Sequence, residues 1–384
     1  MSSAAEPMQL QPLPAASLSP AVAKLVGGAI PAKLMAARGM APLRPAELLV
    51  AIYQLSFDGD AVVRAAAEAA PGSFPDNVIN PPLGEALPAP LLHFFATRLP
   101  GQRTAALERI LYNPATADET FVMLAGRLDE SLLEVVAQNE VRLLRCPAIV
   151  EALFFNKRAR MSSVNRAVEL CARNGVRLEG IPAFDEIVSA IRQDPEATDA
   201  AAIDSRFQAV LTAAEAASPP GGAPGQGGEL GDGEAAPEEK RRAAGMSFIK
   251  FDDLRLFEKI RLATVGNAYC RKMLVRDSNR LVAMTVIRSP QITNMEIQRI
   301  AGSTNVCDDV IRYIANSRDC SKDYAVKLAL VSNPKCPLGS SLRFLAYLHP
   351  DDLRNISRSK NIPGVLATSA KKLLQQREGG RHQR

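Results

Sequence analysis

Cysteine and histidine are the side chains from which a metal site or a nucleophilic centre is most readily built. This chain has six cysteines and three histidines among its 384 residues. The cysteines are at least thirteen residues apart, and His93, His349 and His382 are scattered. Zinc ligands usually come in tighter pairs such as C-x2-C. We therefore expect reduced thiols that pack as small apolar residues, no metal, no cofactor and a cytoplasmic location.

Motifs that support catalysis are not found in the sequence. No GxGxxG, P-loop, HExxH or GxSxG pattern occurs. His349 precedes Pro350 at a helix boundary, and we interpret it as a capping residue. Three Asp-Asp pairs lie near predicted helix starts, where a carboxylate stabilises the positive end of the helix dipole; they are Asp252-Asp253, Asp308-Asp309 and Asp351-Asp352. We predict no catalytic residue and a protein that is not an enzyme.

Basic residues follow a regular spacing in the C-terminal part of the chain. Eight residues mark predicted helix stops there: Gly266, Asp277, Ser289, Ser303, Ser317, Asn333, His349 and Ser359. A basic residue stands four to six positions before seven of these stops: Arg261, Lys272, Arg299, Arg312, Lys327, Arg343 and Arg354. In stacked helices such positions would form two rows, one on each face. The rows are either solvated helix surface or a basic groove for an acidic protein or a phosphate backbone.

The segments between these stops are predicted to be short helices. Apolar residues recur at helical spacing, as in Val306, Val310, Ile311 and Ile314, and Thr293 with Glu296 forms a capping-box pair. Helices of ten to twelve residues are not stable alone, so each must bury its apolar stripe on neighbours. Two helices make a repeat of roughly 23–30 residues, which is typical of a solenoid. We predict an all-α fold of stacked short antiparallel helices.

Composition divides this solenoid into two parts. Residues 215–245 are rich in Gly, Pro and charge and lack large apolar side chains, which predicts a disordered linker. Residues 246–384 contain 24 Lys/Arg and 12 Asp/Glu, whereas residues 1–245 contain 22 and 29. The predicted organisation is a mostly disordered tail (1–40), an acidic helical-repeat domain (41–214), the linker (215–245), a basic helical-repeat domain (246–376) and a disordered basic tail (377–384). No apolar run approaches the ~20 residues of a membrane span.

Several strings in the C-terminal part resemble a known class of repeat protein. They are "GNAYCRKMLVRDSNRLVAMTVIRSPQIT", "ALVSNPKCP" and "LRNISRSKNIP". They resemble bacterial α-solenoids of the HEAT-like and leucine-rich-repeat-variant type, and among these a group with no assigned activity. The resemblance covers residues 255–376 well and 44–192 loosely. It implies stacked antiparallel helices and a binding role, and it transfers no catalytic residue.

Two classes of function follow from these observations. The first is a non-enzymatic scaffold or adaptor whose basic C-terminal part binds an acidic protein, or contacts the acidic part of its own chain. The second is a nucleic-acid-binding HEAT-like protein, including, less readily, a DNA-repair glycosylase. A glycosylase needs Trp or Tyr beside a catalytic carboxylate, and this chain has no Trp. We therefore favour the scaffold with a protein partner.

Overall fold

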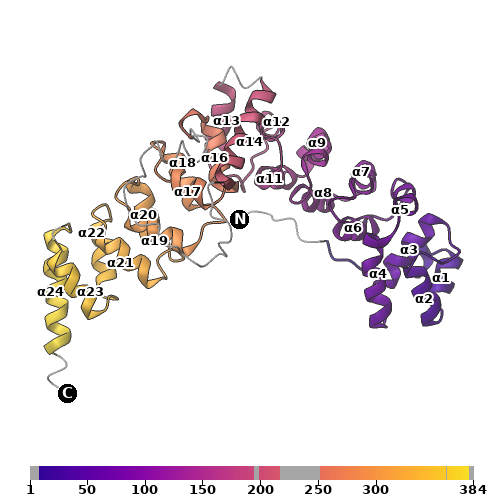
Figure 1. The fold of residues 1–384 in the computed structure, drawn as a ribbon, viewed down its shortest axis with the longest axis horizontal. Coiled ribbons are helices and arrows are strands. Elements are labelled where there is room, and N and C mark those ends of the chain that lie inside the picture. Colours follow the sequence, from indigo (N-terminus) through magenta and orange to yellow (C-terminus); the bar gives the residue numbers. More distant parts are fainter. Residues whose placement is uncertain (1–7, 194–198, 217–250, 360, 380–384) are drawn as a thin grey trace. The chain divides into compact units, whose positions relative to one another are not determined.

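The protein is all-helical in the regions that its structure describes. The structure, a computed structural model, describes residues 8–193, 199–216, 251–359 and 361–379. Within these ranges it contains 23 α-helices, two short 3-10 helices and no β-strand (Figure 1). The chain divides into two compact units, residues 1–184 and 185–384. The prediction of an all-α protein is confirmed.

The first unit consists of short helices that contact one another in two interleaved series. Contacts join α1 with α3, α2 with α4, and so on up to α7 with α9. Each helix thus packs on the helix two places along the chain, which gives a short helix the burial that it needs. The bounds are η1 Ala15–Ser17, α1 Pro20–Val26, α2 Ile30–Ala37, α3 Pro45–Leu55, α4 Ala61–Ser73, α5 Asp76–Leu83, α6 Ala89–Arg98, α7 Thr104–Tyr112, α8 Asp118–Ala125, α9 Glu130–Gln138, α10 Glu140–Arg145, α11 Ala148–Phe155 and α12 Met161–Arg173.

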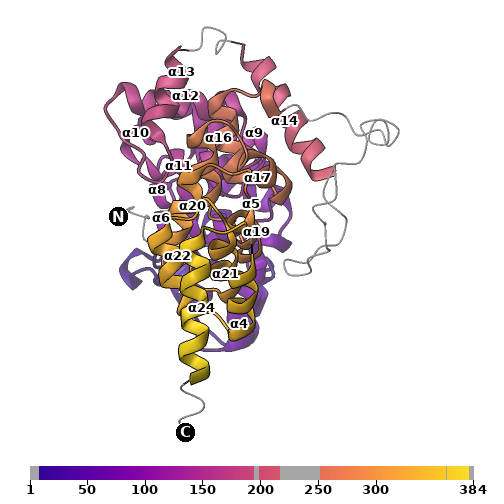
Figure 2. The same ribbon diagram turned by 90° about the vertical axis from the view of Figure 1, so that its left-hand side faces the viewer.

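The second unit has the same kind of neighbour contacts. They join α16 with α18, α18 with α20, α19 with α21 and α22 with α24, and Figure 2 shows α24 alongside α22. A hydrogen bond from Arg343 on α22 to the Ala315 carbonyl ties α22 to α20. The bounds are α13 Phe184–Gln193, α14 Ala200–Ala216, η3 Phe251–Asp253, α16 Leu256–Val265, α17 Ala268–Leu274, α18 Arg280–Ile287, α19 Asn294–Gly302, α20 Asp308–Asn316, α21 Tyr324–Ser332, α22 Leu338–Leu345, α23 Pro350–Arg358 and α24 Gly364–Gly379.

The N-terminal segment differs from the disordered tail predicted for residues 1–40. Its described part includes α1 and α2, which contact α3 and α4. Both helices have a proline in the first turn, where a missing N–H is tolerated. The segment before them is held by the Tyr53 hydroxyl, which donates to the Gln11 carbonyl at 2.6 Å. The frequent Pro and Ala were therefore helix starts and small packing residues instead of signs of disorder.

The boundary between the units also differs from the prediction, because α13 and α14 belong largely to the second unit. Arg206 on α14 donates to the Glu258 carboxylate on α16 at 2.7 Å. Asn267, at the start of α17, donates to the Ala214 carbonyl on α14 at 2.8 Å. Most of the predicted linker 215–245 lies outside the described residues, and α14 runs through its first two positions. At the other end, α24 continues to Gly379, into the predicted tail 377–384.

Charge is distributed differently from the predicted acidic domain 41–214. The first unit, residues 1–184, contains 17 Lys/Arg and 17 Asp/Glu and is neutral. Residues 185–245 contain 5 and 12, so the whole acidic surplus lies there. The acidic surplus and the basic helices are therefore parts of one unit.

Buried asparagines connect successive repeats. Asn113, Asn156 and Asn333 each follow a helix, and each is at most 7% exposed. The side-chain amide donates to two carbonyls at the end of an earlier helix, and the side-chain oxygen accepts from the N–H two residues further on. We call this arrangement an asparagine bridge. The accepting carbonyls, at 2.7–3.2 Å, are those of Leu83 and Glu85 for Asn113, Ala125 and Leu128 for Asn156, and Ala301 and Ser303 for Asn333.

Arginines perform the same task at other helix ends. Arg127 donates to the carbonyls of Thr97 and Leu99 at the end of α6, at 3.1 and 3.0 Å. Arg377 donates to those of Ala346 and Leu348 after α22, both at 2.6 Å. Like the asparagine bridges, these contacts join residues 28–32 positions apart. The same separation thus recurs at five helix ends in both units.

Replacing Asn333 with alanine tests the bridge. Asn333→Ala leaves two carbonyl groups without their donor, and we expect the free energy of unfolding to fall by about 2–3 kcal/mol. Asn316→Ala, at an exposed asparagine that ends α20, should change it by less than about 0.5 kcal/mol. Chemical denaturation of the full chain measures both values. Equal losses would show that the bridge does not stabilise the stack.

Candidate functional site

Arg261, the first of the seven predicted basic residues, is completely buried. Its exposed fraction is 0%, and its guanidinium lies 5.0 Å from the centre of the Phe207 ring of α14. Burial lowers the pKa of Arg261 to about 9, although the nearby Asp204 carboxylate acts in the opposite direction. The residue joins α14 to α16 inside the second unit. The prediction that it lines a binding surface is therefore wrong.

The other six predicted residues lie at or near the surface. Lys272, Arg299, Arg312, Arg343 and Arg354 are exposed. Lys327 is half-buried; its Nζ donates to the Lys322 carbonyl at 3.0 Å and lies 5.3 Å from the centre of the Tyr347 ring.

The register of these side chains differs from the predicted rows. The helix-ending residues Ser303, Asn333 and Ser359 are equivalent, because the N–H of each bonds to the carbonyl three residues earlier. Arg299 stands four residues before its stop, Lys327 six and Arg354 five. One residue turns the direction of a side chain by about 100° on a helix. The three bases therefore project in different directions from their helices and do not form a single line.

Carboxylates of the second unit neutralise only some of its cations. Arg354 pairs with Asp351 at 2.9 Å, and Arg312 with Asp309 at 3.8 Å. Asp309 also pairs with Arg280, and the other ion pairs are Arg206–Glu258, Lys259–Asp277, Arg271–Glu296, Lys322–Asp319 and Lys335–Asp308.

Nine exposed cations of the second unit have no such partner. In the part of the chain that the structure describes, their side chains make no hydrogen bond or ion pair: Arg192, Lys272, Arg276, Arg288, Arg299, Arg318, Arg358, Lys371 and Lys372. We call them the unpaired cations. They are the candidate functional site, because an exposed charge without an internal partner remains available to an external one. Two of the seven predicted residues, Lys272 and Arg299, belong to this set.

The first unit uses its arginines in another way. Seven of its fourteen arginines pair with a carboxylate 24–32 residues earlier, at distances up to 3.4 Å. The pairs are Arg98–Glu68, Arg103–Asp76, Arg142–Asp118, Arg145–Asp118, Arg158–Asp129, Arg160–Glu130 and Arg166–Glu134. Exposed pairs of this kind stabilise little individually. They do occupy the charges, which leaves a neutral unit.

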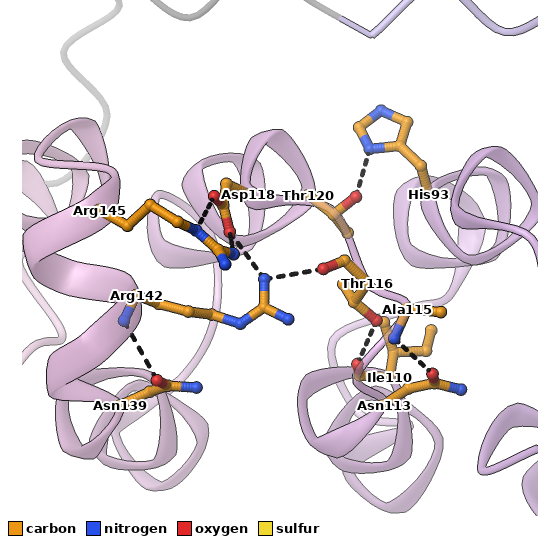
Figure 3. A network of polar contacts seen from close by, with 10 residues as sticks. All are labelled: His93, Ile110, Asn113, Ala115, Thr116, Asp118, Thr120, Asn139, Arg142 and Arg145. Carbon is orange, nitrogen blue, oxygen red and sulfur yellow. Dashed lines mark hydrogen bonds and ion pairs between the residues drawn. The ribbon is translucent and has the colours of Figure 1, made fainter. Parts of the chain in front are cut away.

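Asp118 is the centre of one such network (Figure 3). It receives Arg145 through two hydrogen bonds of 2.5 and 2.7 Å and Arg142 at 2.7 Å. Arg142 also donates to the Thr116 carbonyl and covers the Phe121 ring at 4.2 Å. The hydrogen bond from Arg145, above all, lowers the pKa of Asp118 below its ordinary 3.8. A carboxylate with these partners stays ionised near neutral pH and ties α10 to α8; it is not free to act as a base.

Two other groups that could do chemistry are also used within the fold. His93 on α6 is 8% exposed, and its Nδ1 lies 2.8 Å from the Thr120 hydroxyl (Figure 3). Tyr324 on α21 donates its hydroxyl to the Asp352 carboxylate at the start of α23 and accepts from the His349 N–H at 3.0 Å. The described structure therefore does contain a tyrosine beside a carboxylate, and the pair of Tyr324 and Asp352 connects α21 to α23.

The cysteines are free thiols, and burial raises the pKa of Cys171 and Cys270 to about 11. Such thiols stay protonated near neutral pH and are poor nucleophiles. Among the described residues no three His, Cys, Asp or Glu side chains are grouped as a metal site would require. No described helix is both long and apolar enough to cross a bilayer.

Comparison with known proteins adds no relative. No protein family, no curated protein and no solved structure matches this chain. The functional argument therefore depends on the surface chemistry of the described residues.

Replacing Arg261 separates the buried cation from the surface ones. Arg261→Gln removes a charge from a site built around it, and we expect the free energy of unfolding to fall by about 3 kcal/mol or more. Lys272→Gln should change it by less than about 0.5 kcal/mol. Urea denaturation of the two variants decides. A loss at Lys272 as large as that at Arg261 would show that Lys272 is structural as well.

His93 should give the first unit a pH-dependent stability. Burial holds its folded pKa below the ordinary 6.5, with the nearby Glu119 opposing and Arg98 assisting. The unfolded chain therefore binds a proton first, so the stabilisation is complete above pH 6.5 and declines as the pH falls towards the folded pKa. We expect His93→Asn to flatten the fall in melting temperature between about pH 7 and 5. His349→Asn, at an exposed histidine, is the control; an unchanged slope in His93→Asn would contradict the assignment.

Proposed function

We propose that this protein is a non-enzymatic helical-repeat scaffold whose second unit binds an acidic protein. The unpaired cations carry this proposal. Exposed arginines and lysines without internal carboxylates attract an acidic surface through their summed field and can be satisfied on contact. The first unit, with 17 basic and 17 acidic residues, lacks such a surplus, so within the scaffold it serves as a supporting element.

The repeat architecture supports the scaffold part of the proposal. Helices two places apart in the chain contact each other, and the bridges join residues 28–32 positions apart. An α-solenoid of the HEAT-like or leucine-rich-repeat-variant type would show both features. Solenoids present extended surfaces made by successive repeats, and they bind partners through them. A bacterial, cytoplasmic protein of this type is the identity that we propose. It rests on the resemblance of residues 255–376.

Nucleic acid is the second candidate ligand, because phosphates are bound by the same cations without sequence readout. The scarcity of exposed aromatic side chains favours a protein ligand over a nucleic acid. Bases of single strands stack on exposed aromatics, and Tyr347 is the one aromatic residue of the second unit among the large apolar side chains that the described structure exposes.

Polyanion binding tests the proposal directly. We would titrate the full chain with poly-glutamate and, separately, with a short DNA duplex, at low salt and at about 150 mM salt. Lys272→Gln with Arg299→Gln should weaken poly-glutamate binding several-fold and reduce its salt dependence, because two cations are lost. The matched control is Arg160→Gln with Arg166→Gln, which removes the same charge from paired arginines of the first unit.

The outcomes are distinct. The proposal is supported if the chain binds poly-glutamate and if Lys272→Gln with Arg299→Gln weakens this binding while the control double variant does not. Binding confined to DNA at about 150 mM salt favours the nucleic-acid alternative. Equal effects of the two double variants, or no binding of either polyanion, would show that the unpaired cations are solvated surface only.

A further inference from the structure

Helix α22 of the second unit exposes an apolar stripe. Leu338 and Leu342 are 42% and 36% exposed, and Ala346 continues the series as an exposed residue. Positions i, i+4 and i+8 lie on the same side of a helix. Ser341, Phe344 and Leu345 of the same helix are buried, at 0–3% exposure. Since Leu345 lies seven positions after Leu338, the stripe borders the buried face of α22 and forms its exposed edge.

Most of the large apolar side chains that the second unit exposes lie on this helix or on the segments that follow it in the chain. Of its six large apolar residues that are exposed in the described structure, four lie within residues 338–365: Leu338, Leu342, Tyr347 and Val365. Large apolar side chains that are exposed together usually mark a binding surface, whereas isolated ones are ordinary. In Figure 2, α22 and α24 lie side by side. Their contact leaves the stripe of α22 uncovered among the described residues.

Two cations border the stripe. Arg343 is exposed, and its guanidinium donates to the Ala315 carbonyl at 3.0 Å. Lys327 lies over the Tyr347 ring at 5.3 Å. Neither cation forms an ion pair within the described ranges of the chain. Both are fixed beside the apolar side chains by neutral contacts, which leaves their charges available to a ligand.

We propose that the α22 face binds an acidic amphipathic helix of a protein partner. Such a helix would lay apolar residues at i, i+3 or i+4 and i+7 on Leu338 and Leu342. Its flanking carboxylates would meet Lys327 and Arg343. The inference deepens the proposed function, on which it rests, because it names the partner's chemistry and the helix that receives it.

The chain's own acidic segment does not fit this face. Residues 217–245 match the cations in charge but contain one large aliphatic residue, Leu230. One such side chain cannot fill a stripe two turns long. A second copy of the chain is also a poor fit, since it would bring Lys327 and Arg343 against a face that carries the same cations. Charge complementarity thus selects an acidic partner.

The test is to select peptides that bind the immobilised full chain from a library of random displayed peptides. We expect the enriched sequences to combine apolar residues at helical spacing with an excess of Asp and Glu. Synthetic copies should bind wild type and lose about tenfold or more in affinity for Leu342→Ser, because a single apolar anchor often dominates such contacts. A scrambled copy of each peptide, which has the same charge without the apolar stripe, should bind at least several-fold more weakly.

Val141→Ser is the matched control. Val141 lies on α10 of the first unit and is 74% exposed, so its replacement also removes one exposed aliphatic side chain. It should leave peptide affinity unchanged, and the melting curves of both serine variants should match that of wild type.

Three results would overturn the inference. They are enriched peptides without acidic excess, peptides that bind Leu342→Ser as tightly as wild type, and a concentration-dependent dimer that Leu342→Ser dissociates. The second result would leave the proposed function intact if Lys272→Gln with Arg299→Gln still weakened poly-glutamate binding. Loss of peptide binding in Leu342→Ser but not in Val141→Ser supports the α22 face.

Discussion

The helical fold depends on how the carbonyl groups at the ends of its short helices are satisfied. Every α-helix leaves its last carbonyls without intrahelical donors, and a chain of 23 described helices multiplies this problem. Leaving such a group buried and unpaired costs about 1–3 kcal/mol. Here a side chain of the next repeat supplies the donor, through an asparagine amide or an arginine guanidinium. The helix ends are thereby joined to the repeat that follows them, and the same contact sets the spacing between repeats.

The sequence predicts the helices better than the bridges. Asn333 precedes a proline and is predicted as a helix stop, because proline cannot continue a helix and asparagine adopts turn conformations; Asn113 also precedes a proline. The second use of the same amide, across 28–32 residues, requires knowledge of which helix lies alongside. Residues 8–40 were missed for a related reason. Their helices are short and rich in alanine, so they are stable only when they pack against α3 and α4.

Charge shows the same limit. Sequence spacing treated Arg261 and Lys272 as equivalent, yet one is enclosed beneath Phe207 and the other is in solvent. A basic residue on an amphipathic helix can extend its stem along apolar surface or be enclosed by it, and the choice depends on the neighbouring helix. The surplus of positive charge in residues 246–384 follows from composition alone. Which cations remain without a carboxylate could be decided only when the partners from other repeats were in place.

The packing of α14 on α16 has a practical consequence for dividing the chain. These helices are 40 residues apart from Ala216 to Leu256, yet Arg206, Phe207 and Ala214 all contact the region that begins at Glu258. A fragment that starts at residue 246 would lack α13 and α14 and would expose the buried Arg261 and Glu258 to solvent. Expression of the second unit should begin near residue 185. Conversely, if a protease cuts the chain between residues 217 and 250, the two pieces should remain associated through the contacts of α14 with α16 and α17 until the protein is denatured.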